Sequence, residues 1–222
     1  RIKSPLVSLK GQWVEETWES FFKAAGQAIL AQPKKVLVGL SAYMTNEEMM
    51  DALETLSQLG VSQFTWLLDE KTVEDRQAFD GILKHHDQTP NAAGYLQIME
   101  KTKTPWLRHD EAMKKLQSKE FDHFVLFGLE GIVLPGVADL LLKTPKETQV
   151  VIHATNRVAL FEKATWILPN TSSFEKSGTM VNALGMMQKL KAAMPWQYFS
   201  RDVHAVVFGL RQGNDRTVSP SG

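Results

Sequence analysis

The sequence contains no cysteine. Disulfide bonds, thiolate ligands for zinc or iron–sulfur clusters, and a cysteine nucleophile are therefore excluded within this chain. No apolar run reaches the roughly 18 residues that span a bilayer, so we expect no direct insertion into a membrane. Lys and Arg together number 25, as do Asp and Glu, and no basic stripe stands out. Because nucleic-acid binding needs clustered excess positive charge, we expect no nucleic-acid partner.

Catalytic motifs with fixed spacing are also missing. The patterns G-x-S-x-G, H-E-x-x-H and G-x-x-x-x-G-K-[ST] do not occur. His85, His86 and Asp87 are adjacent, but neighbouring side chains point apart on most backbones, and no second group has the spacing of metal ligands. His153 follows an apolar run and is interpreted as a partly buried, hydrogen-bonded imidazole. We therefore predict no catalytic residue and no metal ligand.

What is present is an ordinary globular composition. The 222 residues are 43% hydrophobic and 23% charged, which is enough to bury a core. The first residue is Arg1 and no secretory pattern follows it, so we expect a piece of a longer protein. No linker rich in Pro, Gly or Ser divides the chain. We predict one compact domain over 1–222, with 1–105 and 106–222 as possible sub-lobes.

Short apolar runs alternate with segments of helical periodicity. Strands are predicted at 36–40, 64–68, 124–127, 150–153 and 166–168. Helices are predicted at 14–32, 45–59, 110–118, 137–142, 156–162 and 201–210, with a short helical turn at 96–101. Thr45 and Glu48 have the spacing of a capping box, Asp110 and Ser200 are predicted N-caps, and Gly60 is a predicted helix stop. Residues 186–194 are predicted to be extended. The alternation predicts a parallel α/β sheet.

Three loops follow predicted strands, at 41–46, 128–131 and 169–185. In a parallel α/β sheet, ligands bind where such loops diverge from the carboxyl ends of the strands. The turn at Gly128 either holds a ligand or is a tight strand exit. Two features argue against a phosphate ligand: Glu130 would oppose an anion, and the glycine spacing is not G-x-G-x-x-G. Glu175 either orients a ligand or holds its loop through backbone N–H groups, and we favour the second interpretation.

Several stretches, in order, resemble the molybdopterin oxidoreductase family, most closely the large iron–sulfur subunit of NADH:quinone oxidoreductase, respiratory complex I. Residues 1–29, 41–56 and 79–94 carry part of this resemblance. The strongest match is to a family pattern of Leu-Pro, Glu-x-x-Gly-Thr, Asn-x-x-Gly-Arg and Gln. It falls here on Leu168, Pro169, Glu175, Gly178, Thr179, Asn182, Gly185 and Gln188.

The resemblance implies parallel-sheet, Rossmann-like layers of the formate dehydrogenase and DMSO reductase type. It also implies a parent protein of the respiratory chain, in which electrons pass from NADH through FMN and iron–sulfur clusters to quinone. The clusters would be held by residues upstream of Arg1. The partners would be other subunits of the NADH dehydrogenase complex, and the location would be peripheral, on the cytoplasmic side of the inner membrane.

The sequence departs from the family pattern at functional positions. Met186 stands where the family has an arginine suited to pairing with phosphate or carboxylate. Glu130 lies in Gly-Leu-Glu-Gly, where molybdenum enzymes often have Gly-x-Asn/Asp-Pro, and no cysteine can bind molybdenum. We therefore interpret the pocket as vestigial and expect no cofactor in this fragment. Its candidate residues are Gly128, Glu130, Glu175, Gly178, Thr179, Asn182 and Gly185.

The sequence thus predicts a scaffold domain, within such a large iron–sulfur subunit, that performs no turnover itself. A different class of function remains open, namely a working pterin-dinucleotide site in a formate-dehydrogenase-like molybdoenzyme. A third possibility is an unrelated nucleotide-binding α/β module.

Overall fold

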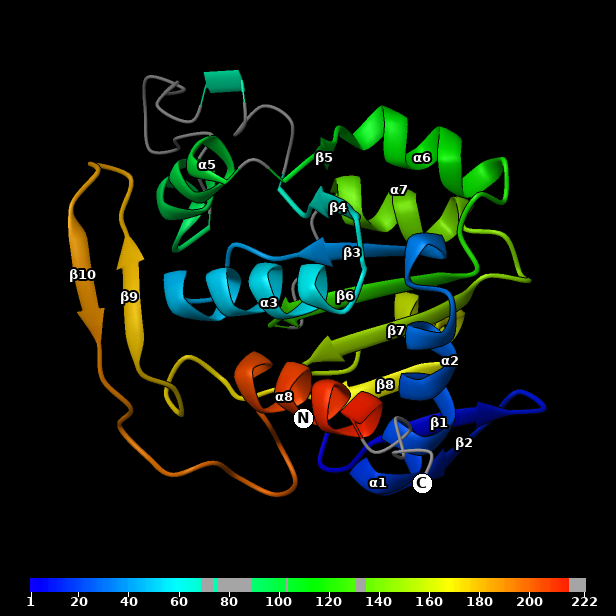
Figure 1. Ribbon diagram of the computed structural model, residues 1–222. Helices are drawn as coiled ribbons and strands as arrows, with labels where there is room; N and C mark the ends of the chain where they lie inside the picture. The colour runs from blue at the N-terminus through cyan, green and yellow to red at the C-terminus, as the bar shows by residue number, and fades with distance from the viewer. Residues whose placement is uncertain (69–73, 76–88, 103, 131–134, 216–222) are drawn as a thin grey trace, which may run out of the picture.

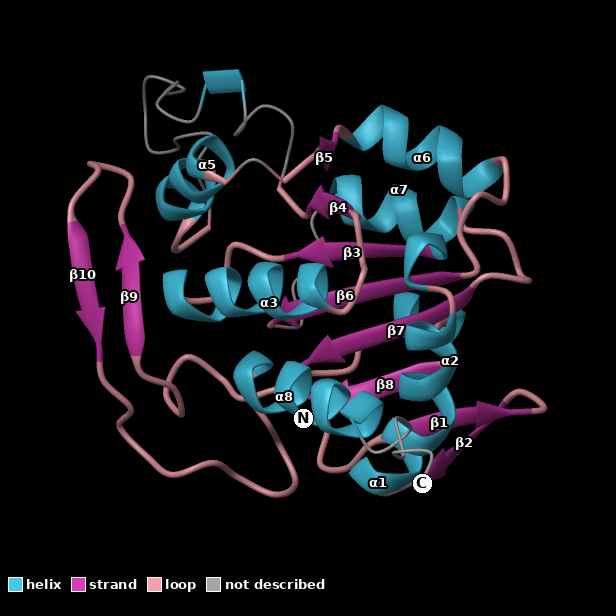
Figure 2. Ribbon diagram, viewed as in Figure 1, coloured by secondary structure: helices cyan, strands magenta, loops and turns pink. Residues whose placement is uncertain are grey.

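A computed structural model describes residues 1–68, 74–75, 89–102, 104–130 and 135–215. An eight-stranded sheet lies between two layers of helices, and a separate two-stranded hairpin stands beside α3 and α5 (Figures 1 and 2). The predicted α/β class is therefore confirmed. The adjacent His85, His86 and Asp87 lie outside the described residues.

The large sheet has the order β2-β1-β8-β7-β6-β3-β4-β5. Its strands are β1 (Leu6–Leu9), β2 (Gln12–Glu15), β3 (Val36–Leu40), β4 (Gln63–Trp66), β5 (Trp106–Leu107), β6 (His123–Leu129), β7 (Gln149–Ala154) and β8 (Trp166–Pro169). Strands β3 to β8 are mutually parallel, whereas β1 runs antiparallel to both β2 and β8. The sheet includes strands from both predicted sub-lobes, and the predicted domain limits stay a prediction.

The parallel strands are added along the chain in two directions from β3. The chain starts at β3, moves outward to β4 and β5, and then returns to place β6 on the other side of β3, followed by β7 and β8. This is the doubly wound strand order 3-2-1-4-5-6. The direction reverses between β3 and β6. Because their loops leave in opposite directions, this switch point is where such sheets form a ligand crevice.

The helical elements cover both faces of the sheet. They are α1 (Trp18–Phe21), the π-helical turn η1 (Phe22–Gly26), α2 (Gln27–Ala31), the 3-10 turn η2 (Pro33–Lys35), α3 (Asn46–Gln58), α5 (Ala92–Lys101), α6 (His109–Gln117), α7 (Pro135–Lys143), the 3-10 helix η3 (Ala159–Lys163) and α8 (Val203–Asp215). Among the described helices, none is long and apolar enough to cross a bilayer.

Alternate residues of the central strands supply two separate cores, one for each face. On β3, Val36, Val38 and Leu40 join the core that includes side chains of α1, α3 and α8, whereas Leu37 joins the core of α6 and α7. All five residues of β3 and all seven of β6 are buried. Burial on both faces explains why these strands are continuous apolar runs in the sequence.

Several predicted boundaries are confirmed. Thr45 caps α3: its Oγ1 accepts a hydrogen bond from the Glu48 N–H at 3.1 Å, and Glu48 Oε2 accepts one from the Thr45 N–H at 2.8 Å. Gly60 follows the end of α3 with φ +92°, which suits a helix stop. The segment predicted to be extended contains β10 (Met187–Leu190), which pairs with β9 (Gly178–Val181).

Other boundaries were wrong because a cap or a pairing partner was not visible. The first helix begins at Trp18 rather than 14, since Thr17 caps it and residues 12–15 pair with β1. Arg108, not Asp110, is the N-cap of α6. Asp202, not Ser200, caps α8: its Oδ1 accepts a hydrogen bond from the Ala205 N–H at 2.9 Å. Helix α5 begins at 92 rather than 96, and 159–163 is a 3-10 helix.

Candidate functional site

The loops after β3, β6 and β8 meet at the carboxyl edge of the sheet, beside the switch point. The contact is made by Lys176, whose side chain is only 2% exposed. Its Nζ lies 3.3 Å from Glu48 Oε2 and 4.0 Å from Glu130 Oε1, and it donates a hydrogen bond to the Tyr43 carbonyl oxygen at 3.2 Å. One ammonium group therefore connects the β3 loop, the start of α3 and the end of β6.

Glu48 has two structural roles in this cluster. Its Oε2 accepts the N-cap hydrogen bond from the Thr45 N–H and also faces Lys176 Nζ. The whole residue is 1% exposed, so its charge depends on these partners for compensation. Burial raises the pKa of Glu130, and Lys176 partly offsets that effect. The buried ammonium thus faces two carboxyl groups.

The residues at the switch point do not fit a pyrophosphate-bearing cofactor. A phosphate at such an edge is normally met by free backbone N–H groups and positive charge. Here the carboxyl groups of Glu48 and Glu130 lie 3.3 and 4.0 Å from Lys176 Nζ, and this ammonium group is already engaged with Glu48 and the Tyr43 carbonyl. A bound anion would have to displace Lys176 and then lie against two carboxyl groups.

Gly128 lies near the end of β6, where the pairing register with β7 shifts between Leu126 and Leu129. Its φ is +79°, and a Cβ added there would lie 2.2 Å from Met44 Cγ. The β6 backbone thus approaches the β3 loop closely enough to require glycine. This geometry agrees with the interpretation of the turn as a strand exit.

Gly178 and Thr179 lie against the first turn of α3. The Thr179 N–H and Oγ1 donate hydrogen bonds to Glu47 Oε2 and Oε1, both at 2.7 Å, and Thr179 Oγ1 accepts one from Asn46 Nδ2 at 3.1 Å. Burial raises the pKa of Glu47, but the bonds from Thr179 outweigh it and the pKa is lowered. A Cβ at Gly178 would approach Thr45 Cβ to 2.8 Å. These two candidate residues serve to fix β9 on α3.

Glu175 holds its own loop in place, as the favoured interpretation predicted. Its Oε2 accepts hydrogen bonds from the Ser172 N–H and Oγ at 2.7 Å and from Arg1, and its Oε1 accepts one from the Gln197 N–H at 2.6 Å. Burial raises its pKa, but these hydrogen bonds outweigh burial and the pKa is lowered. Glu175 thereby ties together the N-terminus, its own loop and the segment that precedes α8.

Asn182 and Gly185 form the turn of the hairpin rather than part of the crevice. Asn182 Oδ1 accepts hydrogen bonds from the N–H groups of Leu184 and Met186, at 3.1 and 3.0 Å. Gly185 has φ +80° and no neighbouring atom within 4 Å of an added Cβ. Met186, at the family's arginine position, is 54% exposed. The structure therefore does not bring the strongest sequence match together as one pocket.

Sequence reasoning missed Lys176 and Asn91. Asn91 is fully buried; its Nδ2 donates to the Met44 carbonyl at 2.9 Å and to Asn46 Oδ1 at 3.0 Å, and its Oδ1 accepts from the Val181 N–H at 2.7 Å. The Thr-Pro-Asn-x-x-Gly pattern at 89–94 was the available signal for Asn91. Lys176 had none, because its partners come from the β3 loop, the first turn of α3 and the end of β6, all far from it in the sequence.

His153 is a hydrogen-bonded imidazole as predicted, but it is fully rather than partly buried, and its Nδ1 has no hydrogen-bond partner. Its Nε2 lies 2.9 Å from the Arg201 carbonyl oxygen, and burial lowers its pKa to about 4. The neutral ring therefore persists at neutral pH. The described residues contain no group of three or more His, Asp or Glu side chains that could hold a metal ion.

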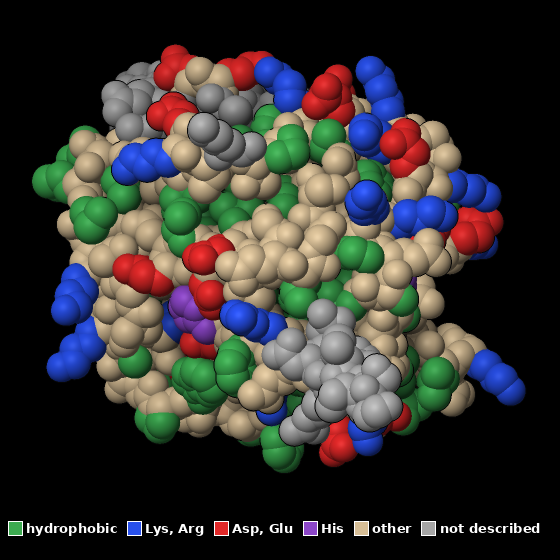
Figure 3. Space-filling model, viewed as in Figure 1, with side chains coloured by type: hydrophobic (Ala, Val, Ile, Leu, Met, Phe, Trp, Pro, Cys, Tyr) green, Lys and Arg blue, Asp and Glu red, His purple; other side chains and the backbone are tan. Residues whose placement is uncertain are grey.

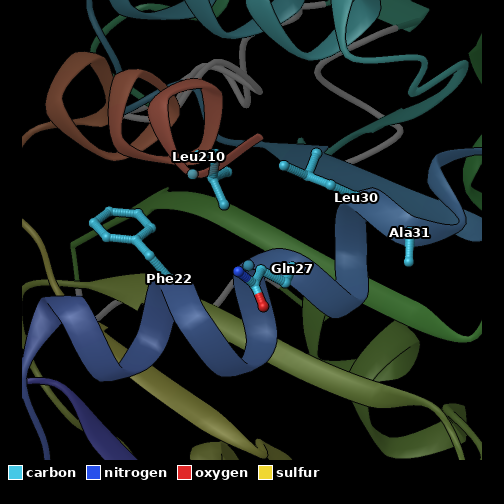
Figure 4. A pocket seen from close by; sticks show the side chains of 7 residues that line it. Phe22, Gln27, Leu30, Ala31 and Leu210 are labelled. Atoms are coloured by element: carbon cyan, nitrogen blue, oxygen red, sulfur yellow. The ribbon is translucent and has the colours of Figure 1, made fainter. Parts of the chain in front are cut away.

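A cavity of about 260 Å³ lies away from the crevice, between α2 and α8 (Figure 4). Its lining is mostly apolar: Phe22, Leu30 and Ala31 come from the first helical segment and Leu210 from α8, and Gln27 is a polar neighbour. No titratable side chain lines it. The cavity offers a gap between helices but no group for acid–base chemistry.

No protein-family model matches, and no curated protein matches significantly. Acetylene hydratase from Pelobacter acetylenicus has a similar structure over 47% of this chain, with 11% identity and a TM-score of 0.35, and the match spans 15% of that protein. TcdA (CsdL) is similar over 90% of this chain and 94% of its own, with 10% identity and a TM-score of 0.34. Likenesses this distant carry no argument about function.

Proposed function

We propose that the chain is a scaffold domain of the molybdopterin oxidoreductase type, without a cofactor of its own, in a protein like the large iron–sulfur subunit of NADH:quinone oxidoreductase. The parent would take part in electron transfer from NADH to quinone, with its iron–sulfur clusters held outside these residues. It would associate with the other subunits of that complex at the cytoplasmic face of the inner membrane. The assignment to this family rests on the ordered sequence matches.

The absence of catalysis is supported by one structural relationship, the placement of Lys176 between Glu48 and Glu130. In a doubly wound sheet the switch-point crevice is where a dinucleotide binds. Here the chain's own ammonium group, that of Lys176, pairs with the buried carboxylate of Glu48 and lies 4.0 Å from Glu130. Because Lys176 is engaged in holding the fold together, this arrangement supports a scaffold role rather than a ligand-binding role.

Nucleotide binding by the chain provides the first test. A ligand that binds only the folded state must raise its stability, so thermal unfolding is measured with millimolar GDP as the probe. We expect no shift in Tm for the wild-type chain. Lys176→Ala combined with Glu130→Gln is the matched variant, since it clears the crevice and removes one acid. A GDP-dependent shift in the wild type would support a working dinucleotide site and contradict the scaffold proposal.

The parent protein provides the second test. An affinity tag on the full-length subunit allows the native assembly to be purified anaerobically and assayed for NADH oxidation, quinone reduction and iron–sulfur signals in electron paramagnetic resonance. We expect all three, with no molybdenum detected by elemental analysis. Stoichiometric molybdenum and formate oxidation would instead identify a molybdoenzyme.

A further inference from the structure

The hairpin and the loop that follows it expose an unusual set of large apolar side chains. Seven of the thirteen exposed large hydrophobic residues in the described part of the chain fall between 184 and 199, and an eighth is Phe174. Their exposed fractions lie between 46% and 79%. We call this set the apolar face; it comprises Phe174, Leu184, Met186, Met187, Met194, Trp196, Tyr198 and Phe199.

Backbone contacts hold parts of the apolar face together. The N–H groups of Ala193 and Met194 donate to the Phe174 carbonyl oxygen at 2.8 and 3.2 Å, and the Phe199 N–H donates to that of Lys3 at 3.1 Å. Figure 1 shows β9 and β10 at the left of the fold and the following loop passing below them toward α8. Exposed apolar surface of this extent is typical of an interaction site.

The charge of this segment has one sign. Residues 176–201 contain Lys176, Lys189, Lys191 and Arg201 but no Asp or Glu. Lys189 and Lys191 are exposed, and Lys3 Nζ lies 5.1 Å from the centre of the Tyr198 ring. On the side where the hairpin lies, at the left of Figure 3, hydrophobic and basic side chains form the outer edge and acidic ones lie further in. The apolar face therefore has a basic rim.

The loop is held in shape before any partner binds. Glu175 accepts hydrogen bonds from the Gln197 N–H and from Ser172, and it pairs with Arg1. The Glu175 bond anchors Gln197, directly after Trp196, and the bonds from Ala193 and Met194 to the Phe174 carbonyl anchor the residues before it. Because an ordered loop loses little conformational entropy on association, this anchoring favours binding.

We propose that the apolar face binds a protein surface that presents apolar side chains with Asp or Glu at its rim. A second copy of the chain would present another segment with basic residues and no Asp or Glu, so it offers no charge complementarity to this one. A lipid surface usually requires clusters of about four to eight basic residues, whereas this rim is sparse and the apolar residues extend along a hairpin and a loop. The inference uses the proposed function only to name the assembly in which the partner is sought.

The test uses the native assembly purified through the tagged full-length subunit. Carbodiimide joins lysine amines directly to carboxylates, and mass spectrometry locates the links. We expect Lys189 and Lys191 to be joined to Asp or Glu of another polypeptide in the assembly, and links only to the rest of the same polypeptide would overturn the proposal. Lys114 and Lys143, on α6 and α7, serve as control lysines and should not form these links. Links from the controls alone would overturn the proposal.

Two sets of variants measure the contribution to binding. Lys189→Glu with Lys191→Glu should reduce retention of the partner at least tenfold, while the control Lys143→Glu should not, with thermal melts verifying that each variant folds. Glu175→Gln keeps every contact residue and should weaken retention by loosening the loop. Unchanged retention in the charge-reversed variant would overturn the proposal.

The isolated chain is used to test the two other possible occupants of the apolar face, a second copy of the chain and a lipid surface. Dimerisation at micromolar concentration in sedimentation, abolished by Trp196→Ala, would replace the proposal with a second copy. Flotation with phosphatidylcholine–phosphatidylglycerol vesicles would replace it with a membrane surface. If the assembly forms the expected links but does not oxidise NADH, the proposed function fails and this inference stands. If the assembly oxidises NADH but does not form these links, this inference fails and the proposed function stands.

Discussion

Lys176 Nζ lies 3.3 Å from Glu48 Oε2, and both side chains are 2% exposed. A buried ion pair contributes little net stability compared with apolar residues, but removing one partner leaves an uncompensated charge. Because Glu48 also accepts the N-cap hydrogen bond of α3, it cannot turn away from this position without loss of the cap. The pair therefore joins the crevice to the start of the helix.

Lys176→Met should destabilise the fold by about 3–5 kcal/mol, because Glu48 is left buried and unpaired. Urea denaturation measures this change in the free energy of unfolding. Lys114→Met is the matched control, since Lys114 and Asp110 form an exposed pair at 3.8 Å and the loss should stay below about 1 kcal/mol. Adding Glu48→Gln to Lys176→Met should recover part of the stability. Equal effects of Lys176→Met and the control would contradict a buried pair.

His153 makes stability depend on pH in the acidic range. Burial lowers its pKa from the ordinary 6.5 to about 4, so the unfolded chain binds a proton in an interval where the native ring stays neutral. Acidification through this interval therefore favours unfolding, and stability rises again as pH increases from about 4 to 6.5. Across this pH interval the free energy of unfolding changes by about 3 kcal/mol because of this one group.

Replacing the ring should remove this contribution. His153→Gln keeps an N–H that can bond the Arg201 carbonyl but does not titrate. Between pH 7 and 4 the wild type should lose about 3 kcal/mol more than the variant, as measured by denaturation at each pH. Subtracting the two curves cancels the titration of all other groups. Parallel curves would show that the native imidazole becomes protonated at the usual pH.

The sequence predicted the parts of the fold that depend on neighbouring residues. The buried strand β3 and the Thr45–Glu48 capping box each lie within a few positions, and both are confirmed. Strands β1 and β2 were missed because each has four residues and depends on pairing, in the case of β1 with distant β8. Ser200 was a plausible cap by type, yet Asp202 was closer to the real helix start.

The candidate site was predicted only in outline. The convergence of three loops at the carboxyl edge follows from parallel topology, and the contacts of Lys176 confirm it. The role of Lys176 was not predictable, because its partners are separated from it by 46 or more positions in the chain. Asn182 and Gly185 were grouped with the crevice by sequence pattern, but a hairpin carries them away from it.

Gly128 should tolerate substitution less well than Gly185, although both have nearly the same φ, +79° and +80°. An alanine costs roughly 1–2 kcal/mol in this left-handed region at either position. At Gly128 the added Cβ would also lie 2.2 Å from Met44 Cγ, whereas nothing lies within 4 Å at Gly185. Gly128→Ala should therefore cost about 1–3 kcal/mol more than Gly185→Ala in chemical denaturation. Equal costs would show that the β3 loop moves aside freely.

Asn91 joins three segments through one amide, so its removal should loosen the hairpin. Asn91→Ala leaves the Met44 carbonyl and the Val181 N–H without their partner, with an expected loss of about 2–4 kcal/mol. Asn156→Ala is the control, because Asn156 is exposed and its Nδ2 has only a 3.3 Å bond to Thr155 Oγ1. The free energy of unfolding of Asn156→Ala should stay within about 0.5 kcal/mol of the wild type.

Asn91→Asp separates lost hydrogen bonds from lost volume. The carboxylate can still accept from the Val181 N–H, but it cannot donate to the Met44 carbonyl or to Asn46 Oδ1. Protonation restores one donor, so this variant should regain stability relative to the wild type as pH falls, whereas Asn91→Ala should not. Amide hydrogen exchange provides the local measurement: at neutral pH the Val181 N–H should exchange faster in Asn91→Ala, whereas the carboxylate of Asn91→Asp should keep it protected. Unchanged protection of the Val181 N–H in Asn91→Ala would mean that the packing of β9 on α3 holds the hairpin without Asn91.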